Sequence, residues 1–157
     1  MGVYKLDKLM DETRRLAAEY RRSTGSTLPV SAELAKFDAI SLLGLRSPDT
    51  PISGVDALAD SDQGEQRIQI KGRVIFDAKK SGQRVGQLNL DADWHVVLLV
   101  IMDEAYQTTA IYSLAKQRLL DELTQSSDSK NNARGAISVK KFQAIADLVW
   151  PAPLTSS

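Results

Sequence analysis

Apolar and polar residues alternate strictly in the middle of the chain. Residues 67–73 read R-I-Q-I-K-G-R, which has the period of a strand with one buried face. The tetrapeptide S-D-Q-G at 61–64 precedes this strand and has the composition of a tight reversal. We therefore predict a β-hairpin over 54–73, in which Ser61 faces Gly64 and Asp56 faces Gln69.

The remaining apolar positions fall into helical spacing or into continuous runs. Gly25 and Gly44 each follow a segment of helical spacing and suit C-terminal caps. The run W-H-V-V-L-L-V-I-M at 94–102 is apolar almost throughout, as expected of a strand that is buried on both faces. Together these patterns predict helices over 3–22, 31–44, 114–123 and 135–150, and further strands over 94–102 and 108–112.

These elements indicate one domain. The chain has 157 residues, which suits a single core, since domains usually contain about 100 to 150 residues. We predict a domain over 1–154 of class α/β (α+β), with a mixed central β-sheet flanked by helices. The N-terminal helix (1–25) packs on a core formed by 31–123, a mobile loop follows at 124–134, and the last helix covers 135–150.

The overall composition excludes several classes of site. The 20 basic and 20 acidic residues cancel, so the chain as a whole does not attract a polyanion or a membrane surface. The absence of Cys excludes disulfides, thiolate metal sites and Cys nucleophiles. The N-terminus lacks an apolar signal core, and no apolar run reaches the ~20 residues of a membrane span. We therefore expect a cytoplasmic protein with no membrane partner.

One local excess of charge stands out in this neutral chain. The segment 71–84 contains a single acid, Asp77, against five basic residues: Lys71, Arg73, Lys79, Lys80 and Arg84. Such an excess suits contact with a phosphate backbone. The candidate nucleic-acid-binding residues are therefore Arg73, Lys79, Lys80 and Arg84, although a solvated loop explains the same residues equally well.

Two other features are interpreted as structural. The arginine pairs at 14–15 and 21–22 interleave with Asp11, Glu12 and Glu19, which is typical of a solvated helix face. His95 is the only His and stands at the start of the apolar strand. It is interpreted as a structural, hydrogen-bonded residue and not as a base or ligand.

The hairpin places candidate chemistry on one of its faces. If Asp56 faces Gln69, their β-carbons lie about 5 Å apart, and Lys71 follows on the same face. A carboxylate, a second oxygen donor and an ammonium group suit a hard cation such as Mg²⁺, with phosphate as a substrate. A solvated hairpin with ordinary polar residues is the alternative interpretation.

The spacing of these residues resembles a nuclease signature. G-V-D at 54–56, a gap of 12 residues, and Q-I-K at 69–71 resemble the Asp…(Asp/Glu)-x-Lys signature of the restriction-endonuclease-like (PD-(D/E)XK) nuclease superfamily. The order of elements over 31–123 is also similar to the core of that superfamily: a helix with a Glu, a hairpin, an apolar strand, another strand and a helix. The chain departs from the family at two positions, because Val55 replaces a Pro and Gln69 replaces the second acid.

The resemblance implies a fold, an activity and a set of roles. The fold would be restriction-endonuclease-like, and the activity would be phosphodiester hydrolysis on a nucleic acid, DNA ahead of RNA, with Mg²⁺ or Mn²⁺. Asp56, the side chain of Gln69 and the backbone carbonyl of Ile70 would hold the metal. Lys71 would orient or deprotonate the attacking water and oppose the charge that develops on the phosphorane.

Glu33 is the fourth residue to which the resemblance gives a role. On a helical wheel it lies between Leu34, Phe37 and Ile40, so it points along the apolar stripe of its helix. The resemblance implies an outer or second-metal ligand at this position. The alternative is a Glu without a functional role, whose side chain extends into solvent at the end of the helix.

The substitution at Gln69 leaves the activity open. A Gln carbonyl can ligate Mg²⁺ but brings no charge, so the metal affinity should fall. The chain could therefore be a nucleic-acid-binding or assembly module of the same fold, without catalysis and without a metal. A homodimer is compatible with either interpretation. A helix-turn-helix reading of the last helix lacks the preceding helix and tight turn that the motif needs.

Overall fold

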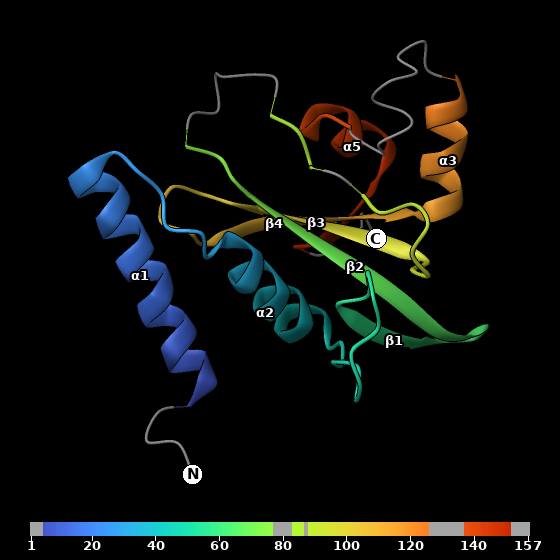
Figure 1. The fold of residues 1–157 in the computed structure, drawn as a ribbon, viewed down its shortest axis with the longest axis horizontal. Helices are drawn as coiled ribbons and strands as arrows, with labels where there is room; N and C mark the ends of the chain where they lie inside the picture. The colour runs from blue at the N-terminus through green and yellow to red at the C-terminus, as the bar shows by residue number, and fades with distance from the viewer. Residues whose placement is uncertain (1–4, 77–82, 87, 126–136, 152–157) are drawn as a thin grey trace, which may run out of the picture.

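The structure, a computed structural model, describes residues 5–76, 83–86, 88–125 and 137–151. Five strands form one mixed sheet in the order β1-β2-β3-β4-β5. Figure 1 shows α1 and α2 on one face of this sheet, and α3 and α5 on the other. The elements are α1 (Leu6–Thr24), α2 (Ser31–Leu43), β1 (Ala57–Ser61), β2 (Gly64–Val74), β3 (Val96–Met102), β4 (Thr108–Ala115), α3 (Lys116–Gln125), α5 (Val139–Ile145) and β5 (Asp147–Trp150).

Strand β3 is the centre of the molecule. All of its residues are buried, which confirms the prediction of a strand covered on both faces. Val96, Leu98, Val100 and Met102 pack in the core on the side of α1 and α2. Val97, Leu99 and Ile101 pack in a second core with α3 and α5. The predicted mixed sheet with flanking helices is thus present.

The predicted hairpin has the predicted register. Strands β1 and β2 pair antiparallel, with Ala57 opposite Ile68 and Ser61 opposite Gly64. Strand β2 then runs on to Val74 in parallel pairing with β3, whereas β1 begins only at Ala57. Because the chain before Ala57 turns away, no strand of the described residues lies beside the outer edge of β2 beyond residue 69.

Helix α2 approaches this edge closely because of one glycine. A β-carbon on Gly72 would lie 2.5 Å from the β-carbon of Ala35 and 3.1 Å from the carbonyl oxygen of Ser31. Only a residue without a side chain allows the first turn of α2 to pack at this distance from β2. Gly44 ends α2 in a left-handed conformation, as predicted, and Gly25 does the same for α1.

Helix α1 is attached to the domain by a buried ion pair. Arg14 is 5% exposed, and its Nη2 lies 2.8 Å from Oδ1 of Asp38 on α2. Thr108 donates to the same carboxylate at 2.5 Å, and Arg14 also donates to the carbonyl of Tyr106. The prediction of a solvated face is therefore wrong for Arg14, because the small residues Ala17 and Ala18 bring this side of α1 against the core.

The C-terminal region differs from the prediction of one helix over 135–150. Helix α5 ends at Ile145, and Asp147–Trp150 forms β5, which pairs antiparallel with β4. The spacing of Ile145 and Val149 fits a helix, but Pro151 disfavours a helical conformation for Trp150, the residue directly before it, and β4 offers an edge with which Asp147–Trp150 can pair. Of the predicted loop at 124–134, residues 124 and 125 belong to α3, and 126–134 lie outside the described residues.

Among the described residues, no helix is both long enough and apolar enough to cross a membrane.

Candidate functional site

A pocket opens at the outer edge of β2, where the first turn of α2 passes over it. Its volume is about 400 Å³. The structure brings together Glu33, Asp56, Gln69, Lys71 and Arg73 around this opening. The lining is completed by Ser31, Ala32, Lys36, Gly54, Ile70 and Gly72.

Asp56 is fixed at the point where the hairpin opens. Its backbone N–H donates to the carbonyl of Ile68 at 2.8 Å, and its Oδ2 accepts from the N–H of Ile70 at 2.8 Å. Gly54 supports this position with φ 77, since a β-carbon there would lie 2.4 Å from that of Ala92. The carboxylate thus replaces the missing strand partner of Ile70, and Oδ1 has no hydrogen bond within the described part of the chain.

Gln69 contributes a buried oxygen without a partner. The residue is 6% exposed, and its Oε1 makes no hydrogen bond to any described residue. Burying an amide oxygen without a partner costs free energy, so such an atom needs an explanation. The N–H of Ile70 points to Asp56 at the outer edge of β2, and its carbonyl points to the same side, because both groups of one strand residue share a direction.

The lining of the pocket carries more cations than anions. Lys36, Lys71 and Arg73 stand against Asp56 and Glu33. Lys71 is half-buried, and its ammonium group has no hydrogen bond or ion pair within the described residues. The arrangement can therefore attract an anionic group such as phosphate.

Glu33 lies at the rim of the pocket and not in the core. Its side chain is 71% exposed, and its carboxylate is 3.9 Å from the ammonium group of Lys36. The prediction that Glu33 points along the apolar stripe is wrong, because Glu33 lies in the first turn of α2, only two residues after its start, and its side chain extends into solvent. Lys36 was not predicted from the sequence as a site residue. Its position one turn after Glu33 could have indicated it, because residues at this spacing lie side by side on a helix.

The predicted nucleic-acid-binding residues have different environments. Arg73 donates to the carbonyls of Gly72, Arg84 and Val85 at 2.6 to 2.7 Å, and burial lowers the pKa of its guanidinium group. Arg73 is among the residues that line the pocket, but the hydrogen bonds of its guanidinium group tie β2 to the segment 83–86. Arg84 is exposed, and Lys79 and Lys80 lie outside the described residues.

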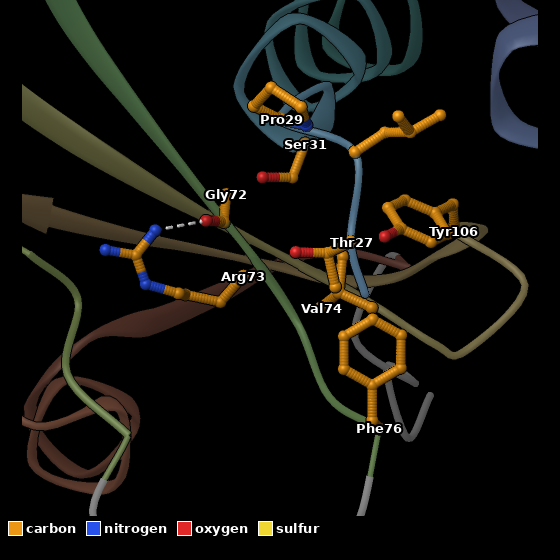
Figure 2. A pocket seen from close by; sticks show the side chains of 9 residues that line it. Thr27, Pro29, Ser31, Gly72, Arg73, Val74, Phe76 and Tyr106 are labelled. Carbon is orange, nitrogen blue, oxygen red and sulfur yellow. Dashed lines mark hydrogen bonds between the residues drawn. The ribbon is translucent and has the colours of Figure 1, made fainter. Parts of the chain in front are cut away.

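A second, smaller cavity adjoins the pocket along β2. Its volume is about 190 Å³, and it shares Ser31, Gly72 and Arg73 with the first. Figure 2 shows the side chain of Arg73 on one side of β2, while Thr27, Phe76 and Tyr106 lie on the other.

His95 is a structural residue, as predicted. The ring Nδ1 of His95 accepts a hydrogen bond from the backbone N–H of Arg67 at 2.9 Å. The backbone N–H of His95 donates to the carbonyl of Arg67 at 2.8 Å. Both bonds continue the pairing of β2 with the start of β3. The imidazole is not among the residues that line the pocket.

The described residues contain no group of three or more His, Cys, Asp or Glu side chains that could hold a metal ion. A cation in the pocket would therefore need mixed donors: the Asp56 carboxylate, the Gln69 amide oxygen and the Ile70 carbonyl. All three are oxygens, which suit Mg²⁺ or Mn²⁺ and do not suit softer metals.

No family model matches the chain, and no curated protein matches it.

Proposed function

We propose that the pocket on β2 binds a phosphodiester of a nucleic acid and hydrolyses it with the help of Mg²⁺ or Mn²⁺, on a restriction-endonuclease-like fold. The observation that supports this proposal is that Gln69, which lines the pocket together with Asp56 and Lys71, has a buried Oε1 without a hydrogen-bond partner among the described residues. A ligand that contacts this oxygen would remove the cost of leaving it unpaired.

The residues fit a weakly held hard cation. Asp56, Gln69 and the Ile70 carbonyl are the donors that would hold it, and Glu33 is exposed at the rim as an outer ligand. The chemistry supplied by a bound cation would be Lewis-acid polarisation of a phosphoryl oxygen. The expected metal affinity is low, because Asp56 is the only charged donor among Asp56, Gln69 and the Ile70 carbonyl.

The cationic side chains would position the attacking water and bind the substrate. Lys71 has its ammonium group free within the described residues, so it can position the attacking water and oppose the charge that develops on the phosphorus. Arg73 is held rigidly by three carbonyls and adds a fixed positive charge. Arg84, with Lys79 and Lys80, would follow the backbone of the substrate, DNA ahead of RNA, in a cytoplasmic setting.

Calorimetric titration with Mg²⁺ and Mn²⁺, combined with cleavage of mixed nucleic acids, tests this function. We expect weak metal binding that Asp56→Asn removes, and metal-dependent cleavage that Lys71→Ala removes. Asp62→Asn is the matched control, because Asp62 is an exposed residue in the turn of the same hairpin. Wild-type protein that neither binds the metal nor cleaves would contradict the proposal.

A second candidate function is a nucleic-acid-binding or assembly module of the same fold. It is favoured by the hydrogen bond that the Asp56 carboxylate already accepts from the N–H of Ile70. In that case the carboxylate would serve to complete the edge of β2. Nucleic-acid binding that survives Asp56→Asn and Lys71→Ala, without any cleavage, would distinguish this function from the first.

A further inference from the structure

Helix α1 carries a stripe of apolar side chains that the domain does not cover. Leu6 is 61% exposed, Leu9 40%, Leu16 62% and Tyr20 39%. With Thr13 between them, these residues repeat at intervals of three and four, which is the spacing of a helix–helix seam. We call Leu6, Leu9, Thr13, Leu16 and Tyr20 the α1 stripe.

The α1 stripe is distinct from the face that packs on the domain. At about 100° per residue its members fall within an arc of about 80°, whereas the buried residues Arg14, Ala17 and Ala18 are centred about a third of a turn away. Figure 1 shows α1 at the outer side of the molecule, on the opposite side of α2 from the sheet edge at β1. A partner could therefore reach the stripe without displacing α1.

We propose that the α1 stripe is the contact between two copies of this chain, which pair through antiparallel α1 helices about a two-fold axis at Thr13. The stripe is self-complementary in this arrangement. Leu6 of one copy meets Tyr20 of the other, Leu9 meets Leu16, and Thr13 meets Thr13. A two-fold axis requires this kind of match of one surface with itself.

The charges of α1 favour the antiparallel orientation. Residues 5–12 contain three acids and two lysines, whereas Arg15, Arg21 and Arg22 outnumber Glu19 in the second half of the helix. Antiparallel pairing places the acidic half against the basic half and opposes the two helix dipoles. Lys5 of one copy then lies by position beside Glu19 of the other.

The size of the contact sets the expected strength. A helix of 19 residues is about 28 Å long, so a single pair of helices buries less than the roughly 1,200 to 2,000 Å² of a stable interface. The dimer is therefore weak and forms in the micromolar range. This inference does not depend on the proposed nuclease chemistry, because no residue of the α1 stripe lines the pocket.

Sedimentation of the full chain over about 1 to 200 µM tests the dimer. We expect the mass to rise from monomer to dimer, and Leu16→Glu to raise the dissociation constant by at least about 100-fold, since each dimer contains the residue twice. Leu42→Glu is the matched control, because Leu42 is 42% exposed on α2 and outside the stripe. A monomer at every concentration, or a dimer unaffected by Leu16→Glu, would overturn the proposal.

Cysteine cross-linking tests the orientation, and the chain has no Cys of its own. Under mild oxidation Thr13→Cys should form a disulfide with itself, whereas Arg15→Cys, on the far side of the helix, should not. Leu6→Cys should cross-link with Tyr20→Cys in a mixture but not with itself. Efficient self-cross-linking of Leu6→Cys would overturn the antiparallel arrangement.

Discussion

Gln69 has the most informative environment of any single residue in this protein. Its amide oxygen is buried without a hydrogen bond, while its neighbour Ile70 is tied to Asp56. A polar side chain in a strand that faces solvent would satisfy this oxygen with water. Its burial in a residue that lines the same pocket as Asp56 is what separates the proposed metal-binding site from an ordinary solvated hairpin.

Replacing Gln69 with Glu should make the fold dependent on metal. A carboxylate in this 6% exposed position has no described partner, so Gln69→Glu should lower the free energy of unfolding in chelator by about 1–3 kcal/mol. Added Mg²⁺ should restore the loss, and calorimetry should show a metal affinity at least about tenfold above that of wild type.

Gln66→Glu is the control for this change, because Gln66 lies on the same strand but is not among the residues that line the pocket. It should show neither the loss in chelator nor the recovery with Mg²⁺. Equal metal affinity in wild type and Gln69→Glu would mean that the Gln69 side chain does not face the cation.

The sequence predicts that Asp56, Gln69 and Lys71 lie close together, which they do around the pocket, but it does not predict the environments of all the lining residues. The alternation at 67–73 places Gln69 and Lys71 on one face, and the reversal at 61–64 places Asp56 opposite, so the hairpin follows from local pattern. The ties of Arg73 to the segment 83–86 and of Arg14 to Asp38 depend on contacts between distant segments, which no local pattern contains.

At the level of secondary structure, the hairpin and β3 were predictable, whereas the C-terminal region was not. Strand β3 is apolar at every position, which only a buried strand or helix tolerates, and its β-branched residues favour a strand. Residues 147–150 have apolar positions that suit either structure, and the free edge of β4 decides between them. Pairing with β4, and not the local sequence, therefore decides that residues 147–150 form a strand and not a helix.

The contact between α1 and α2 should depend strongly on the charge of Asp38. Asp38→Ala leaves the guanidinium of Arg14 buried without its carboxylate, and the free energy of unfolding should fall by about 3–5 kcal/mol. Urea denaturation followed by circular dichroism measures this change.

Glu19→Ala is the comparison for Asp38→Ala, because it breaks the ion pair of Glu19 with Arg22 on the exposed face of α1. Glu19→Ala should lower the free energy of unfolding by less than about 1 kcal/mol. Similar losses in the two variants would show that the Arg14–Asp38 pair is not buried in solution.

On the scale of the whole molecule, the net charge of +0 limits how nucleic acid can bind. Affinity must come from the local cations of the pocket and of 79–84, so it should be weak and steeply dependent on salt. We expect the logarithm of the binding constant to fall with the logarithm of salt concentration at a slope of magnitude about 3 to 5.

Lys79→Ala combined with Lys80→Ala should reduce that slope by about two, since each phosphate contact contributes about 0.9. Lys5→Ala with Lys8→Ala removes the same charge from the N-terminal end of α1 and serves as the matched control. Fluorescence anisotropy across a salt series measures both. An unchanged slope in the first double variant would assign the lysines to a solvated loop.

The proposed metal-dependent nuclease site depends on the carboxylate of Asp56. A cleavage assay of Asp56→Asn is the most direct measurement of this role. Wild type, Asp56→Asn and Asp62→Asn are purified identically and assayed on mixed DNA and RNA with Mg²⁺ and with Mn²⁺. We expect metal-dependent cleavage by wild type and Asp62→Asn, and a loss of at least about 100-fold in Asp56→Asn, because Asp56 is the charged member of the proposed donor set of Asp56, Gln69 and the Ile70 carbonyl. Cleavage by Asp56→Asn at the wild-type rate would contradict it.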